Sequence, residues 1–223
     1  MMTMKMMYKP DFKLATNTAD IFLLTAGITQ FSFSLKKLLK KITLYNISIC
    51  SYSKAKQKYG IDPSKLGSND GETVKRADKY IIFYNDDRLK TRQRWTIAHE
   101  IGHIVMKHSF ENVDEQLYSK MEVEANFFAA QLLIPNQIIN IAIERGYNIT
   151  VDFIIRNFNV SEEAAIKKLE TVNKNYKYNY KKDDDSLNIL FRGFVDMIAP
   201  NKFAEIDYFD EEYDMQSKRD EWW

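Results

Sequence analysis

The feature that most constrains this 223-residue chain is the segment His99-Glu100-Ile101-Gly102-His103, an HExxH motif. The chain has three histidines, and two of them occupy this motif. On an α-helix, residues four apart lie one turn apart on the same face, so both imidazoles can approach one ion. Glu100 lies about 100° round the helix from His99, where it can reach a water beside that ion but not the ion itself. This pattern indicates the active site of a metal-dependent hydrolase.

The sequence around the motif predicts the helix that it needs. Ile97, Ile101 and Ile104 recur at i, i+4 and i+7, which gives the helix one apolar face. Thr91 is the expected N-cap. Gly102 costs roughly 1 kcal/mol relative to alanine inside a helix, so we expect its missing side chain to admit substrate or a neighbouring helix. The alternative is that two histidines fall by chance on a surface helix.

A second helical pattern, which begins near Tyr118, supplies a third metal ligand. Its core-facing stripe consists of Met121, Ala125, Phe128 and Leu132. Glu122 lies beside this stripe, 19 positions after His103, which leaves room for a turn and a returning helix. We therefore predict that Glu122 is the third ligand and that Asn126, one turn later, holds a ligand imidazole by a hydrogen bond. The alternative for Glu122 is a solvated helix charge.

Other side chains near the motif are candidates for supporting roles. His108 is nine residues after His99, about 180° round if the helix continues, so we expect it at the helix C-terminus, away from the metal. A helix that ends earlier would free it. Four side chains are candidates for a second donor to the oxyanion: Tyr84, Tyr118, Arg94 and His108.

Two segments in this order and spacing resemble the ImmA/IrrE family of metallo-endopeptidases: RWTIAHEIGHIVMKH at 94–108 and EVEANFFAAQLLIP at 122–135. Weaker similarity extends to KYIIFYNDD, ADIFLLTAGI and FNVSEEAAIKKLE, so it covers about residues 18–172. The resemblance implies a cytoplasmic zincin-like peptidase whose third zinc ligand is a glutamate of the EVEAN segment. Family members commonly act on helix-turn-helix repressors of phages, mobile elements or stress regulons. The segment after about residue 180 matches nothing in the family.

The predicted fold class is α+β: a zincin-like unit with a small three-stranded sheet beside the HExxH helix, followed by a mainly helical C-terminal part. The strands are expected at 47–50, 71–74 and 80–84, with a turn near Ala77 and Asp78. An edge strand can pair with an extended substrate, or it can be covered. The other helices are expected at 19–26, 34–40, 52–59, 137–145, 151–158, 161–171 and 187–198.

Three domains are predicted: a metallopeptidase domain at 1–135, a helix-turn-helix-like module at 136–180, and an acidic aromatic tail at 181–223. Within the module, the helices at 151–158 and 161–171 could contact DNA. However, Glu162 and Glu163 stand at the start of the second helix, where a recognition helix would approach DNA. We therefore favour a packing or repressor-docking role.

Composition limits the cellular setting. Cys50 is the single cysteine, so no intrachain disulfide is possible, which favours a reducing compartment. Apolar stretches such as 21–26 are far too short to span a membrane, and no signal peptide is expected. Residues 1–180 carry 26 basic and 19 acidic side chains, whereas residues 181–223 carry 6 and 12. The basic surplus of residues 1–180 is too small for a segment of that length to predict direct nucleic-acid binding.

These observations predict a zinc-dependent endopeptidase with His99, His103 and Glu122 as ligands and Glu100 as general base and acid. Mn²⁺ is an alternative ion, although the tetrahedral N/O ligand set favours Zn²⁺. The predicted substrate is a protein, a DNA-binding repressor. A competing interpretation is a non-catalytic antirepressor, for which the general base would have no use. A DNA-binding regulator with structural zinc ranks last, because such a site is closed by four ligands that usually include cysteine, and Cys50 is alone and far upstream.

Overall fold

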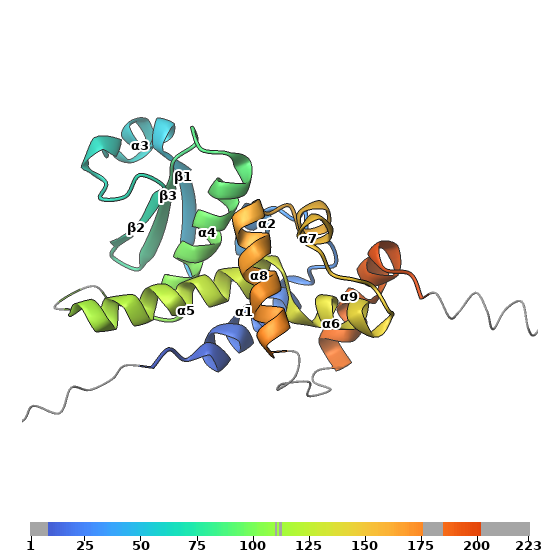
Figure 1. Ribbon diagram of the computed structural model, residues 1–223. Coiled ribbons are helices and arrows are strands. Elements are labelled where there is room, and N and C mark those ends of the chain that lie inside the picture. The colour runs from blue at the N-terminus through green and yellow to red at the C-terminus, as the bar shows by residue number, and fades with distance from the viewer. Residues whose placement is uncertain (1–8, 110, 112, 176–184, 202–223) are drawn as a thin grey trace, which may run out of the picture.

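The computed structural model describes residues 9–109, 111, 113–175 and 185–201. Its elements, in chain order, are α1 (Phe12–Ala26), α2 (Leu35–Lys41), β1 (Ile47–Ser51), α3 (Tyr52–Tyr59), the 3₁₀ turn η1 (Pro63–Lys65), β2 (Gly71–Arg76), β3 (Lys79–Tyr84), α4 (Lys90–Val105), α5 (Glu115–Leu133), α6 (Asn136–Glu144), α7 (Val151–Phe158), α8 (Glu162–Asn175) and α9 (Asp185–Ile198) (Figure 1). The predicted α+β class, with a three-stranded sheet and a mainly helical C-terminal part, is confirmed.

The sheet has the order β1-β3-β2, so β3 is its central strand. β1 runs parallel to β3, with Ile49 opposite Ile82, and β2 runs antiparallel to β3, with Thr73 opposite the same residue. β2 and β3 are joined by the predicted turn, in which Ala77 adopts a φ of 51°. Ile81, Ile82 and Phe83 of β3 are buried, and these side chains attach the sheet to the core.

The helix α4 lies between the sheet and α5, and α1 packs along the other side of α5 (Figure 1). One hydrophobic cluster extends from α1 through α4 and α5 to α9. It includes Phe31, whose ring lies 5.5 Å from that of Phe158 and 5.3 Å from that of Phe191. The buried amide of Gln131 donates to Asp20 Oδ1 over 2.7 Å, which fixes α1 against α5.

Three helix boundaries differ from those that the sequence predicted. α1 begins at Phe12 rather than at residue 19, because Asp11 caps it by accepting a hydrogen bond from the backbone N–H of Leu14. α4 begins at Lys90 after Leu89, so the predicted N-cap role of Thr91 is wrong. α4 also ends at Val105, before the expected position of His108. Gly27 ends α1 as predicted, with a φ of 57°.

The predicted last helix is confirmed by α9, whereas most of the acidic tail, 202–223, lies outside the described residues. The division into domains at 1–135, 136–180 and 181–223 stays a prediction. Within the described part of the chain, every helix taken singly falls short of the length and apolarity that a membrane span requires. The helices α5 and α6, which are bent by 52° relative to each other, together meet the requirement for a membrane span by length and composition alone.

Candidate active site

The site is built where α4 and α5 cross closely at Gly102. A Cβ atom on Gly102 would lie 3.1 Å from both the Cα and the carbonyl oxygen of Ala125, closer than ordinary van der Waals contact. It would also lie 3.2 Å from the Phe128 ring. Of the two roles expected for the missing side chain, the structure shows the approach of a neighbouring helix. This approach brings Glu122, one turn before Ala125, above the two histidines of α4.

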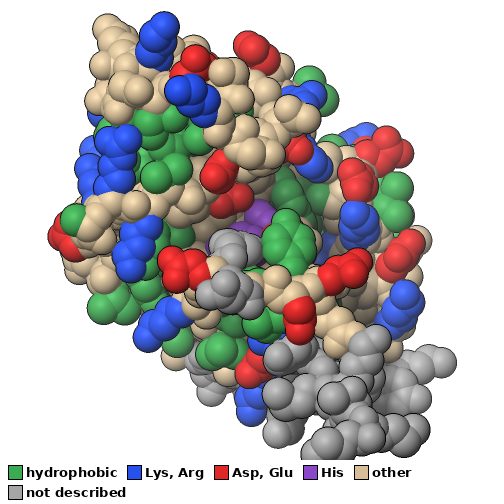
Figure 2. All heavy atoms as spheres, turned by 90° about the vertical axis from the view of Figure 1, so that its left-hand side faces the viewer, with side chains coloured by type: hydrophobic (Ala, Val, Ile, Leu, Met, Phe, Trp, Pro, Cys, Tyr) green, Lys and Arg blue, Asp and Glu red, His purple; other side chains and the backbone are tan. Residues whose placement is uncertain are grey.

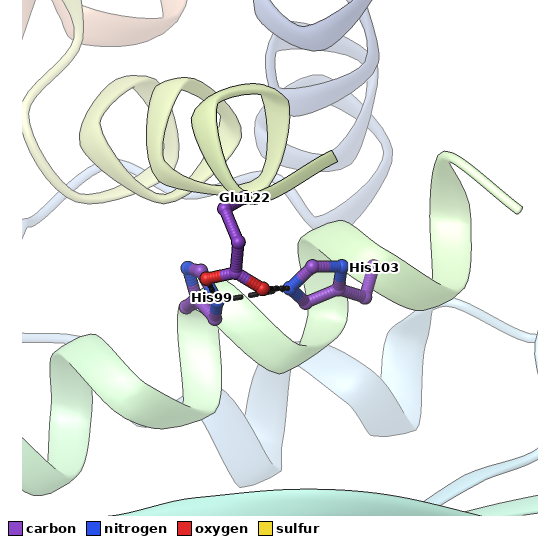
Figure 3. Close-up of side chains that lie close together, drawn as sticks. All are labelled: His99, His103 and Glu122. Carbon is purple, nitrogen blue, oxygen red and sulfur yellow. Dashed lines mark hydrogen bonds and ion pairs between the residues drawn. The ribbon is translucent and has the colours of Figure 1, made fainter. Parts of the chain in front are cut away.

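The three predicted ligand atoms converge on one point (Figure 3). His99 Nε2 and His103 Nε2 are 2.9 Å apart, and oxygens of Glu122 lie 3.4 Å from the first and 3.2 Å from the second. Donors held about 2.1 Å from a tetrahedral zinc ion lie about 3.4 Å from one another. The observed separations are close to this value, so the three side chains fit a metal ion of that size.

The outer nitrogen of His99 is held by Asn126, as the i, i+4 spacing from Glu122 predicted. Asn126 Oδ1 lies 3.1 Å from His99 Nδ1. A carbonyl oxygen can only accept, so Nδ1 carries the proton and the Nε2 lone pair points toward Glu122. That tautomer is the one that a metal ligand needs.

His108 does not lie on the far face of α4, which corrects the sequence-based expectation. The chain leaves α4 through Lys107, whose φ of 58° reverses its direction, and His108 folds back behind His103. The two Nδ1 atoms are 2.8 Å apart. His108 Nε2 lies 3.1 Å from Glu124 Oε2, and Glu124 also accepts the backbone N–H of Asp11 at the start of α1, over 2.6 Å. The alternative of an early helix end is therefore the observed one.

The hydrogen-bonded series from Glu124 through His108 to His103 determines which ring nitrogen of His103 carries the proton. Burial opposes the ionisation of Glu124, but hydrogen bonds from Asp11 and Lys120 outweigh it and lower its pKa. The carboxylate therefore accepts from His108 Nε2. Burial and the neighbouring His103 lower the pKa of His108 to about 4, so His108 is neutral and its Nδ1 accepts. His103 Nδ1 must then donate, which leaves its Nε2 directed at the ligand cluster.

Glu100 is placed by a contact that the sequence did not reveal. Thr73, on the edge strand β2, donates from Oγ1 to Glu100 Oε2 over 2.7 Å. Because Thr73 and Glu100 are far apart in the chain and belong to different elements, no local spacing could have indicated the pair. The contact holds the carboxylate of Glu100 in the cleft beside the histidines.

The structure separates the four candidates for a second oxyanion donor. Arg94 is mostly buried and donates to the carbonyl oxygens of Phe31 and Phe33. Tyr84 packs against the core from β3, and His108 lies behind His103. Tyr118 alone among the four lines the cleft, half-exposed, one turn before Glu122.

An open cleft of about 1540 Å³ contains the site, and its walls come from α1, β2, α4, α5 and α8. Figure 2 shows the histidines at the bottom of a hollow with acidic side chains close by. The edge strand β2 forms one wall through Gly71, Glu72 and Thr73, so part of this edge faces the cleft. The lining also includes α8, the second helix of the predicted helix-turn-helix-like pair. One face of α8 therefore lines the cleft.

An HExxH helix whose histidines meet a glutamate of the next helix, beside a small mixed sheet, defines a protein of the metallopeptidase class. The family model described as "IrrE N-terminal-like domain" (peptidase M78) matches residues 57–170, just over half of the chain. The chain therefore belongs to the ImmA/IrrE family of metallopeptidases. It is similar to Metallopeptidase ImmA of Bacillus subtilis (strain 168), with 28% identity over 123 residues that cover 52% of this chain and 72% of that protein.

Proposed function

We propose that this protein is a zinc-dependent endopeptidase in which His99, His103 and Glu122 hold the metal. The observation that carries the proposal is the convergence of these three donors beside Glu100 at the bottom of an open cleft. Two nitrogen ligands and one carboxylate suit Zn²⁺, and the same set would also accept Mn²⁺. Asn126 would act by orienting His99.

Glu100 is the catalytic residue of this mechanism. When bound, the ion would polarise the scissile carbonyl and make an attacking water more acidic. Glu100 takes a proton from that water, and later gives it to the leaving amine. One of its carboxylate oxygens accepts a hydrogen bond from Thr73 Oγ1, and this contact fixes the orientation of the carboxylate in the cleft.

We assign Tyr118 as the side chain that donates a hydrogen bond to the oxygen of the scissile carbonyl. It lines the same cleft as Glu100, on the helix that carries Glu122. The negative charge of Glu122 and burial raise the pKa of the Tyr118 hydroxyl, so it remains a proton donor at neutral pH. A donor at this position stabilises the charge that develops on the oxygen in the transition state.

The proposed substrate is a helix-turn-helix repressor of a phage, mobile element or stress regulon. Family membership supports a protein substrate, and an open cleft of about 1540 Å³ has room for a peptide segment. Part of the edge of β2 faces the cleft, where it can pair with such a segment. A DNA-bound substrate places the reaction in the cytoplasm, and the buried free thiol of Cys50 suits a reducing compartment.

The competing proposal is a non-catalytic antirepressor that binds the repressor without cutting it. The contact between Thr73 and Glu100 favours catalysis, because binding alone does not need an oriented general base. A structural zinc site in a DNA-binding regulator is less well supported, because a closed site has four protein ligands. Among the described residues, the cluster at His99 offers three.

The test mixes metal-loaded protein with the helix-turn-helix repressor encoded nearest to it and measures fragment masses. Metal content is determined for each sample. Glu100→Gln keeps the size of the side chain and removes its basicity, so it should retain metal and lose cleavage. Glu115→Gln, an exposed change on the same helix as Glu122, is the matched control and should cut like the wild type.

A single cut made by the wild type and by Glu115→Gln, but not by Glu100→Gln, would establish the peptidase and its scissile bond. Cleavage by a metal-loaded Glu100→Gln variant would refute the role of Glu100. Tight binding without any cut would instead favour the antirepressor.

A further inference from the structure

The cleft continues beyond the ligand cluster along α5 toward α8. Its lining runs from Glu122 and Asn126 to Ala130 and Gln131 on α5, and then to Lys168 on α8. The mechanism proposed above uses nothing in this second half. It is therefore available to bind a part of the substrate that lies away from the scissile bond.

Lys168 is an unusual residue for the wall of a cleft, because it is charged and almost fully buried. Its exposed fraction is 5%. Its Nζ donates to Asn136 Oδ1 over 2.6 Å, and Asn136 in turn is held through its backbone N–H by Gln131 Oε1. Asp20 acts electrostatically on Lys168, and its carboxylate accepts hydrogen bonds from the side-chain amides of Gln131 and Gln137.

The acidic side chains around the cleft are mostly paired elsewhere. Glu163 binds Lys167 at 2.6 Å, and Asp70 binds Arg88 at 3.1 Å and Arg92 at 2.6 Å. Glu72 accepts the backbone N–H of Gly67 at 2.6 Å. These acids lie at more exposed positions, as does Glu170, so water screens their repulsion of an incoming anion.

A buried ammonium that bonds to one amide oxygen keeps hydrogen-bonding capacity that a carboxylate could satisfy. Lysine has three N–H donors, and burying its charge is costly. The burial of Lys168 accordingly lowers its pKa to about 7. A carboxylate that enters the cleft would therefore favour the charged form of Lys168 and form a charge-assisted hydrogen bond with it.

We propose that Lys168 forms a subsite for an acidic side chain, aspartate or glutamate, of the peptide that occupies the cleft. This inference rests on the proposed function, since it assigns a preference to the same peptide-binding cleft. Asn136 also lines the subsite and offers its Nδ2 as a second donor.

The dimensions of α5 indicate where the acidic residue lies in the substrate. From Glu122 to Gln131 the helix advances nine residues, or about 13.5 Å at 1.5 Å per residue. An extended peptide covers that distance in about four residues. The acidic residue should therefore lie about four positions from the scissile bond, always on the same side of it.

The test uses a library of peptides made by digesting a whole proteome, and it reads binding and cleavage separately. Full-length, metal-loaded Glu100→Gln protein is immobilised, and the captured peptides are sequenced by mass spectrometry. The same capture is repeated with Lys168→Met, Lys168→Arg or Lys167→Met added. Lys167 is the matched control, because it lines the same cleft but is exposed and already paired with Glu163. Thermal unfolding and metal content of each variant verify that it is folded and loaded.

We expect the captured peptides to be enriched in aspartate and glutamate over their amide counterparts by about tenfold, the effect of one charge-assisted hydrogen bond. Lys168→Met should abolish this enrichment, whereas Lys168→Arg and Lys167→Met should keep it. Equal capture of acidic and amide peptides by the parent, or enrichment that survives in a folded Lys168→Met variant, would overturn the subsite.

The wild type, incubated with the same library, tests the proposed function independently. Cleavage with an acidic residue about four positions from the new terminus supports both proposals. Cleavage with no acidic preference refutes the subsite and leaves the peptidase. Acid-selective capture without cleavage keeps the subsite and refutes the peptidase.

Discussion

Replacement of Gly102 by alanine should have an effect opposite to that of the same change elsewhere in a helix. Alanine normally stabilises a helix interior by about 1 kcal/mol relative to glycine. At Gly102, however, the new Cβ would lie 3.1 Å from two backbone atoms of Ala125, which cannot turn aside as a side chain can. Helix α5 must then retreat by a few tenths of an ångström, and overpacking of this kind costs about 1–3 kcal/mol. We expect a net loss of up to about 2 kcal/mol in the free energy of unfolding.

The same displacement should weaken metal binding. Glu122 is three residues before Ala125 on α5 and moves with it, whereas His99 and His103 remain on α4. Ligand distances in metal sites tolerate about 0.2 Å, so a shift of this size spoils the geometry. We expect the zinc affinity to fall by about tenfold, which corresponds to about 1.4 kcal/mol.

The assays are urea denaturation of the metal-free protein and a zinc titration against a competing fluorescent chelator. Gly193→Ala is the matched control, because Gly193 lies inside α9 and a Cβ there meets nothing within 4 Å. That variant should be more stable by up to about 1 kcal/mol and should bind zinc like the wild type. The reasoning is refuted if Gly102→Ala gains as much stability as the control and keeps its zinc affinity.

Three further predictions concern side chains that act on the site or line its cleft. Thr73→Val, which removes the hydroxyl that donates to Glu100, should lower kcat about tenfold with unchanged metal content; unchanged kcat would deny Thr73 an orienting role. His108→Ala should weaken zinc binding by about 10- to 100-fold in the same chelator titration, because His103 Nδ1 loses its acceptor; full affinity would contradict this. Burial lowers the pKa of Lys168 from 10.5 to about 7, so the unfolded chain binds more protons between these values and stability should rise with pH above 7. Urea denaturation at pH 7 and 9 should show a rise on the order of 1–2 kcal/mol that Lys168→Met lacks, and parallel curves would refute it.

Local periodicity was sufficient to predict much of the fold. The strand at 80–84, the helix around the HExxH motif and the return helix were all expected from the sequence and are present as β3, α4 and α5. The i, i+4 relation of Glu122 and Asn126 also predicted that one face of α5 would meet the histidines. These features depend on neighbours within one or two turns, which a sequence pattern records directly.

The remaining features depend on contacts between distant segments. The reversal at Lys107 puts a lysine at positive φ, a conformation that carries no clear sequence signal outside glycine and asparagine. The burial of His108 between His103 and Glu124 stabilises this reversal. Likewise, the early start of α1 places Phe12 against Phe127, with ring centroids 4.3 Å apart, and no local pattern predicts that pairing.

The attachment of α1 to α5 has a consequence for the length of the N-terminal helix. Two polar contacts hold it against α5: Asp11 N–H to Glu124 at its start, and Asp20 to Gln131 near its middle. Each residue inserted or deleted between them would shift one end by about 1.5 Å and turn it by about 100° relative to the other. The two contacts could then not be made together. Substitutions on the outer side of this helix should therefore be tolerated, whereas a change in its length should break a contact to Glu124 or to Gln131.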